Sequence, residues 1–208
     1  MSSSAAVAAR VAGAIGALGY LMGVVDGPVI GALAGLALVA FGRGLSAPPG
    51  AELLGPACFG VLAGASGSAA LRWGTLDLPE IQGAQGVLGP TVVVEPVAVA
   101  VMSGAALVAS TLALGVWMGE PERGRSLTRW WWVELAAGAL LLATLFSGPP
   151  PSDPGQAGIW LGAATVVGAS ATVIGRPAAK LRLGVRFSIV GVCAAVVAGA
   201  AVASGTLS

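Results

Sequence analysis

The side chains best suited to chemistry in this sequence are ionisable groups inside apolar stretches. Glu134 follows a run of three tryptophans and begins one such stretch, and Arg186 lies near the start of the last one. Placing an ionisable group in membrane hydrocarbon costs about 2.5–3.5 kcal/mol on insertion scales, so each needs a reason to be there. Three interpretations are open: an ion pair between the two, a protonatable Glu134 at the cytoplasmic mouth of a path, or side chains that extend to the headgroups.

A second acidic group, Glu95, directly precedes Pro96 at the expected start of the fourth apolar stretch. An acid beside a proline is typical of a helix start, because the helix dipole favours negative charge there. The alternative makes Glu95 an outer gate or ion ligand that pairs with Arg72. Asp26 precedes Gly27 and Pro28 in the same way and is expected to cap the second helix.

Residues 64–67 read Gly-Ala-Ser-Gly. This is similar to the Gly-x-Ser-Gly pattern around the serine of rhomboid-type intramembrane proteases, which implies a nucleophilic Ser66. That chemistry needs a base to accept the serine proton, and the family uses a histidine. The sequence has no histidine, so we expect Ser66 to serve helix packing.

The absence of histidine also removes the commonest general base, the usual zinc ligand and the axial ligand of many haems. Cys58 and Cys193 lie inside apolar segments, where a small buried hydrophobe is the usual role of cysteine. We therefore expect no catalytic residue, no metal site and no cofactor. The net charge of +1 carries no basic stripe suited to nucleic acid.

The elements that must position these groups are membrane helices. Apolar residues make up 56% of the sequence and charged residues 9%, against about a quarter charged in soluble domains. A span needs about 20 apolar residues. The sequence predicts an all-α bundle in a single integral membrane domain. Its seven predicted spans, of which the second and fifth are short, cover 7–25, 28–45, 53–71, 92–117, 130–147, 157–174 and 183–203.

Basic residues fall almost entirely on one side of this arrangement. Lysine and arginine are retained in the cytoplasm during insertion, so we expect the N-terminus inside and the C-terminus outside. Arg72 alone is expected outside. The segments expected inside hold Arg10, Arg43, Arg123, Arg125, Arg129, Arg176, Lys180, Arg182 and Arg186.

The tryptophans give a second indication of depth, since indole rings favour the headgroup layer. Trp117 and Trp130–Trp132 are expected at the inner boundary, and Trp73 and Trp160 at the outer one. A cleaved signal peptide is the alternative for the first segment, although Leu21–Asp26 does not resemble a small-residue cleavage site. The outer connection 72–91 is expected to form an interfacial helix or to re-enter the protein.

Small residues spaced four apart predict close helix packing. The predicted packing pairs are Gly19 with Gly23, Gly31 with Gly35, Gly60 with Gly64, Ala164 with Gly168 and Ala195 with Gly199. Most would pack internally, and one or two could form a face for a partner subunit. A three-plus-one-plus-three duplication is a further hypothesis, based on Gly42–Arg43 and Gly175–Arg176.

These features favour a non-catalytic subunit that packs with partner proteins in a larger complex, in contact with lipid, in a bacterial cytoplasmic (inner) membrane. The alternative is a transporter or channel for a small solute or ion, acting alone or as a homo-oligomer. Its support is Glu134, Glu95 and the suggested repeat. Its weakness is the lack of a polar helix segment at mid-membrane depth.

Overall fold

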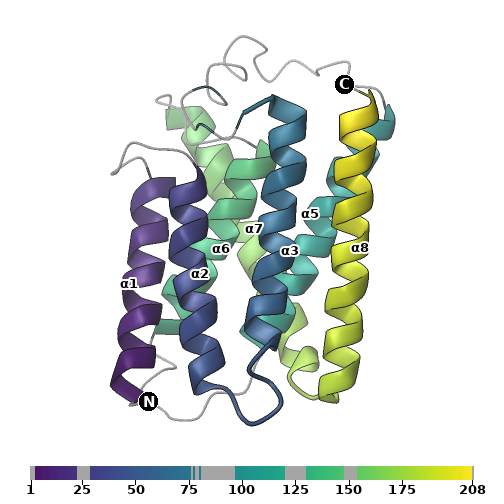
Figure 1. The fold of residues 1–208 in the computed structure, drawn as a ribbon. Helices are drawn as coiled ribbons and strands as arrows, with labels where there is room; N and C mark the ends of the chain where they lie inside the picture. The colour runs from purple at the N-terminus through teal and green to yellow at the C-terminus, as the bar shows by residue number, and fades with distance from the viewer. Residues whose placement is uncertain are drawn as a thin grey trace.

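A computed structural model describes residues 3–22, 29–75, 77, 80, 97–119, 130–147 and 154–207. Within these residues the chain forms helices and no β-strand, which confirms the expected all-α architecture. The helices are α1 (Ser3–Leu21), α2 (Val29–Ser46), α3 (Leu54–Trp73), α5 (Val97–Met118), α6 (Trp131–Ser147), α7 (Pro154–Ala178) and α8 (Leu183–Leu207). They lie side by side in a bundle (Figure 1).

Five of these helices, α1, α2, α5, α7 and α8, are long and apolar enough to cross a membrane. Helices α3 and α6 carry shorter apolar stretches, Leu54–Ala70 and Trp131–Phe146. The second predicted span, 28–45, agrees with α2, which has 18 residues and is long enough to cross. Several long apolar helices in one chain indicate a multi-pass integral membrane protein whose surface contacts lipid.

Two helix boundaries differ from the sequence-based prediction. Helix α1 begins at Ser3 and ends at Leu21 instead of spanning 7–25, because backbone hydrogen bonding continues through small polar residues that an apolar window leaves out. Helix α7 continues past the predicted end at residue 174 and runs through Pro177. A proline near a helix end removes only one donor, and the Ala179 amide still donates to the Gly175 carbonyl at 2.9 Å.

Successive helices run in alternating directions. Figure 1 shows α1 beginning and α2 ending at the lower end of the bundle, whereas α8 ends at the upper end. Helix α5 is central and packs against α3, α6, α7 and α8, while α1 and α2 pack mainly on each other. The start of α6 therefore lies at the same end as the start of α1 and the end of α2 (Figure 1).

The α1–α2 pair packs closely because glycines face each other. A Cβ on Gly13 would lie 2.4 Å from the Gly35 carbonyl oxygen, and a Cβ on Gly35 would lie 2.7 Å from the Ala17 amide nitrogen. Gly31 lies against the Tyr20 ring, where a Cβ would approach to 2.5 Å. Both members of the predicted Gly31–Gly35 pair thus form the contact with α1, where Tyr20 lies opposite Gly31 and Gly13 lies opposite Gly35.

A second close approach joins α5 to α7. A Cβ on Gly119 would lie 2.4 Å from the Gly175 carbonyl oxygen, and one on Gly175 would lie 2.9 Å from the Gly115 carbonyl oxygen. The spacing of Gly115 and Gly119 places both on the α7-facing side of α5. This pair has the same four-residue spacing as the predicted pairs, but it was not among them.

The other predicted packing glycines are less enclosed. A Cβ on Gly64 would contact Val197 of α8 at 3.2 Å, whereas one on Gly60 would meet nothing within 4 Å. Gly60 is exposed, so it does not pack within the described part of the chain. Gly19 is half-buried in α1, and Gly23 lies outside the described residues.

Candidate functional site: a buried ionic network

Three charged side chains from three helices meet inside one end of the bundle. Arg10 Nε of α1 donates to Glu134 Oε1 of α6 at 2.5 Å, and Arg43 Nε of α2 donates to Glu134 Oε2 at 2.7 Å. Arg43 Nη2 is also 2.7 Å from Glu134 Oε2. The side chains of Arg10, Arg43 and Glu134 are 1%, 2% and 1% exposed. We call these three residues the ionic network.

Arg43 extends the network to the end of α5. Its Nη1 donates to the Trp117 carbonyl oxygen at 2.9 Å, and its guanidinium carbon lies 5.9 Å from the centre of the Trp117 ring. Trp131 of α6 donates from Nε1 to the neighbouring Met118 carbonyl at 3.1 Å. The last carbonyls of a helix have no partner within the helix, so these two side chains satisfy groups that α5 itself cannot.

Local structure explains why these residues can meet. Gly42 precedes Arg43, and a Cβ there would lie 2.6 Å from Arg10 Cγ. Because Gly42 has no side chain, the aliphatic part of the Arg10 side chain can cross α2 there. Glu134 belongs to the first turn of α6, and Arg43 to the last turn of α2. Each helix therefore places its charged side chain at the same end of the bundle.

The electrostatics of the network favour the ionised pairs in two ways. Removing charges from water is costly, and the cost is offset only when opposite charges contact and the remaining donors have acceptors. The contacts of Glu134 with both arginines and of Arg43 with the Trp117 carbonyl meet part of that condition, since Arg10 Nη1 is buried without an acceptor among the described residues. The helix dipoles add to it, since Glu134 lies near a helix N-terminus and Arg43 lies against the C-terminus of α5.

Glu134 and Arg186 do not form the ion pair that was one of the three interpretations of the sequence. Arg186 is 5% exposed, and it donates from Nε to the Leu181 carbonyl at 3.1 Å and from Nη2 to the Ala179 carbonyl. These carbonyls belong to the turn between α7 and α8, so Arg186 holds that turn. The Glu134 side chain also does not extend to the headgroups, because α1, α2 and α6 enclose it.

The structure describes only some of the candidate residues that the sequence predicts on the outer side. Arg72 belongs to the last turn of α3, at the end of the bundle opposite the ionic network (Figure 1). Glu95 and Asp26 lie outside the described residues, as does most of the connection 72–91. Ser66 is 1% exposed, and its hydroxyl donates to the Leu62 carbonyl of its own helix at 3.1 Å.

Two tryptophans differ from the expected headgroup positions. Trp117 and Trp160 are 1% and 5% exposed, so their rings face the protein interior. Trp160 Nε1 donates to Thr144 Oγ1 of α6 at 3.3 Å. By contrast, Trp132 is 64% exposed at the start of α6, as expected of an interfacial residue. An indole near a helix end can pack inward as well as toward lipid, and the sequence does not distinguish the two.

The partners of Glu134 were missed from the sequence. The sequence indicates Arg10 and Arg43 only as markers of the cytoplasmic side, although Arg10 lies inside the apolar α1 and Arg43 in the last turn of the apolar α2. That position is a usable signal, because a buried arginine needs an acid and Glu134 was the candidate acid at the same end. The two Gly-Arg pairs are also unlike each other: Arg43 is buried in the network and Arg176 is exposed.

The arrangement is that of a structural tie between helices. Both carboxylate oxygens of Glu134 accept hydrogen bonds from arginine, and the group is closed to solvent. Among the residues that the structure describes, no three cysteine, aspartate or glutamate side chains gather to hold a metal ion.

A comparison with protein families, curated proteins and solved structures found no match to this chain.

Proposed function

We propose that this protein is a non-catalytic integral membrane subunit that packs through α8 against a partner protein in a larger membrane complex. The proposal rests on the difference between the buried face and the exposed face of α8. One face buries Val190, Cys193 and Val197 against its own bundle. The opposite face is exposed, and it carries a stripe of small residues together with the exposed Val185, Val192 and Val202.

A stripe of small residues runs along the exposed face of α8. Exposed positions recur at helical spacing through Gly184, Ser188, Gly191, Ala195 and Gly199. A Cβ on any of these three glycines would meet nothing within 4 Å. Small residues are enriched where membrane helices pack on one another, because they let two backbones approach closely. The neighbouring α3 adds the exposed Gly60 beside this face.

The ionic network supports the same proposal. Glu134 was the main reason to consider a transport path, and a group on such a path must be able to exchange partners with a solute or water. Glu134 instead ties α6 to α1 and α2 through two arginines. This favours a rigid scaffold over a moving carrier.

The proposed orientation places the ionic network at the cytoplasmic side of a bacterial inner membrane, with all seven helices spanning. The described residues at the network end of the bundle include Arg10, Arg43 and the exposed cations of the α7–α8 turn, whereas Arg72 lies at the other end. Cytoplasmic retention of lysine and arginine supports this direction.

A leucine scan of open glycines tests the proposal. Gly191→Leu and Gly199→Leu add side chains where the protein itself has open space, so the bundle should fold with unchanged thermal stability. In tagged protein extracted in mild detergent, each variant is expected to lose a co-purifying subunit that the wild type holds in fixed stoichiometry. Gly162→Leu is the matched control, because Gly162 is equally open but lies on α7.

The outcomes separate the two functions. Loss of a stoichiometric partner in both α8 variants, with retention in Gly162→Leu, supports the subunit proposal. A wild-type chain that purifies without any second polypeptide contradicts it. Solute uptake by vesicles that contain this chain alone, abolished by Glu134→Gln without loss of folded protein, would establish the transporter alternative.

A further inference from the structure

A groove runs along the outer surface between α6 and α7. Its upper part is a cavity of about 610 Å³ lined by apolar and small side chains of both helices, among them Leu135, Leu140 and Leu161. Its lower part is a cavity of about 410 Å³ at the end of α5, where Arg176 and Trp131 lie. Trp132 and Thr172 line both parts, so the two cavities are adjacent.

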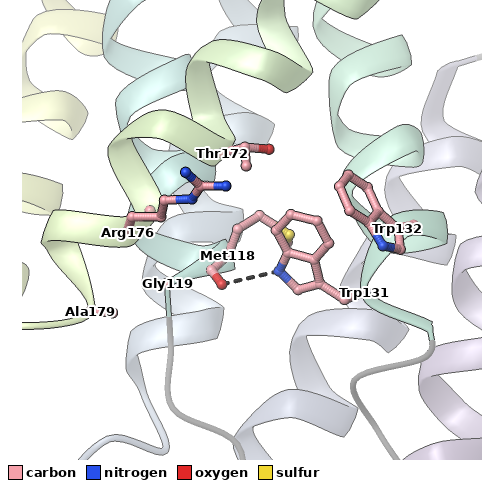
Figure 2. Close-up of a pocket in the computed structure, with 8 residues that line it drawn as sticks. Met118, Gly119, Trp131, Trp132, Thr172, Arg176 and Ala179 are labelled. Atoms are coloured by element: carbon pink, nitrogen blue, oxygen red, sulfur yellow. Dashed lines mark hydrogen bonds between the residues drawn. The ribbon is translucent and has the colours of Figure 1, made fainter.

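The chemistry of the groove changes along its length. Figure 2 shows the Arg176 side chain extending from α7 into the lower part, with the rings of Trp131 and Trp132 across from it. Arg176 is exposed and forms no ion pair or hydrogen bond within the described part of the chain. Arg186, which follows this turn, donates to backbone carbonyls, and Arg182 in the turn does not line the groove. Among the described residues that line the groove, Arg176 is the one charged side chain, and it lies near the end of α7.

We propose that this groove binds one anionic glycerophospholipid, with its phosphate at Arg176 and an acyl chain between α6 and α7. The combination of charge and depth supports this occupant. Basic pockets between membrane helices on the cytoplasmic side bind anionic headgroups, and tryptophan rings favour that same layer. The upper cavity lies within the volume range of small-molecule sites and offers mostly apolar surface to a chain.

The site is independent of the proposed subunit contact, because it uses α6 and α7 and not α8. It also differs from general lipid contact. Ordinary lipid at the surface exchanges without preference for headgroup, whereas a bound lipid with one arginine near its phosphate gains an affinity of about fivefold for the anionic headgroup.

The test is native mass measurement of the purified protein with phosphatidylglycerol or phosphatidylcholine of identical acyl chains. We expect one retained lipid and about fivefold stronger retention of phosphatidylglycerol. Arg176→Gln should reduce retention of phosphatidylglycerol to that of phosphatidylcholine. Arg182→Gln is the matched control, since Arg182 is an exposed arginine in the same turn that does not line the groove, and it should keep the preference.

A second pair of variants tests the acyl part. Ala169 is exposed and lines the upper cavity, so Ala169→Leu should weaken retention of both lipids. Ala194→Leu, an exposed alanine on α8, should leave both unchanged. Excess inorganic phosphate should not displace the lipid. Equal loss in Arg176→Gln and Arg182→Gln, displacement by phosphate alone, or a photoreactive residue at 169 that labels a protein helix in membranes would each overturn the proposal.

Discussion

Arg43 and Glu134 are 91 positions apart in the chain, yet Arg43 Nε lies 2.7 Å from Glu134 Oε2 inside the bundle. The contact joins the last turn of α2 to the first turn of α6. Together with Arg10, it attaches the α1–α2 pair to the rest of the bundle by charge as well as by packing.

Glu134→Gln should destabilise the protein strongly. The change leaves two buried arginines without their counter-charge, and breaking a buried pair in this way costs about 3–5 kcal/mol. Equilibrium unfolding in detergent measures the loss. Glu52→Gln is the control: Glu52 is an exposed glutamate whose Oε2 accepts only the Gly50 amide at 2.8 Å, so its loss should cost less than about 1 kcal/mol.

A triple replacement tests whether the network has a purely structural role. Replacing Arg10 and Arg43 by Met and Glu134 by Leu removes all three charges at once, and exchanging a buried ionic triad for apolar residues is often neutral or stabilising. We expect the triple variant to be more stable than Glu134→Gln alone. A triple variant as unstable as the single one would argue that the charges have a further role.

Arg43→Lys should lower stability by about 2 kcal/mol even though the charge is kept. Arginine donates to Glu134 and to the Trp117 carbonyl from different nitrogens of one planar group. A lysine ammonium is a single point and cannot reproduce both contacts. Thermal unfolding in the same detergent provides the comparison, and an unchanged midpoint would show that the contact with α5 contributes nothing.

Two glycines on α1 should respond oppositely to alanine. At Gly13 the new Cβ would lie 2.4 Å from the Gly35 carbonyl oxygen, so Gly13→Ala should cost about 1–3 kcal/mol through overpacking. At Gly16 a Cβ would meet nothing within 4 Å, so Gly16→Ala should be neutral or stabilise by up to about 1 kcal/mol through helix propensity. Equal effects in unfolding experiments would contradict the close α1–α2 contact.

The sequence predicted the helices well and their mutual positions poorly. Long apolar runs indicate membrane helices by length alone, which is why the predicted segments fall on the seven observed helices. The side of each helix that faces its neighbours is harder to predict, because helices rich in Ala, Gly and Val are apolar all round and have no polar face to mark the surface. Gly31 and Gly35 were identified by their spacing, whereas Gly13 and Gly119 depend on which helix lies opposite.

The site follows the same pattern. Glu134 could be selected because a carboxylate in an apolar run is costly and therefore needs a partner. Its pairing with Arg10 and Arg43 could not be predicted, because Arg186 lies at the same expected depth and only the arrangement of the helices decides between them. In the structure Arg186 is held by Ala179 and Leu181, so it is not available to Glu134.

The proposed orientation predicts that the two ends of the chain lie on opposite sides of the membrane. A reporter active only in the cytosol should work when fused at the N-terminus and fail at the C-terminus, and a reporter active only outside should behave in the opposite way. A fusion in the α2–α3 turn, at Pro48–Gly50, is the internal control and should report cytosol. Both ends on one side would contradict seven spans.

The most direct test of the proposed function is the mass of the complex extracted from native membranes with its surrounding lipid. The account predicts the 20.1 kDa chain bound to a different polypeptide in an integer ratio, released when Gly191 and Gly199 are both changed to Leu. A lone chain, or a closed ring built only of its own copies, would contradict it.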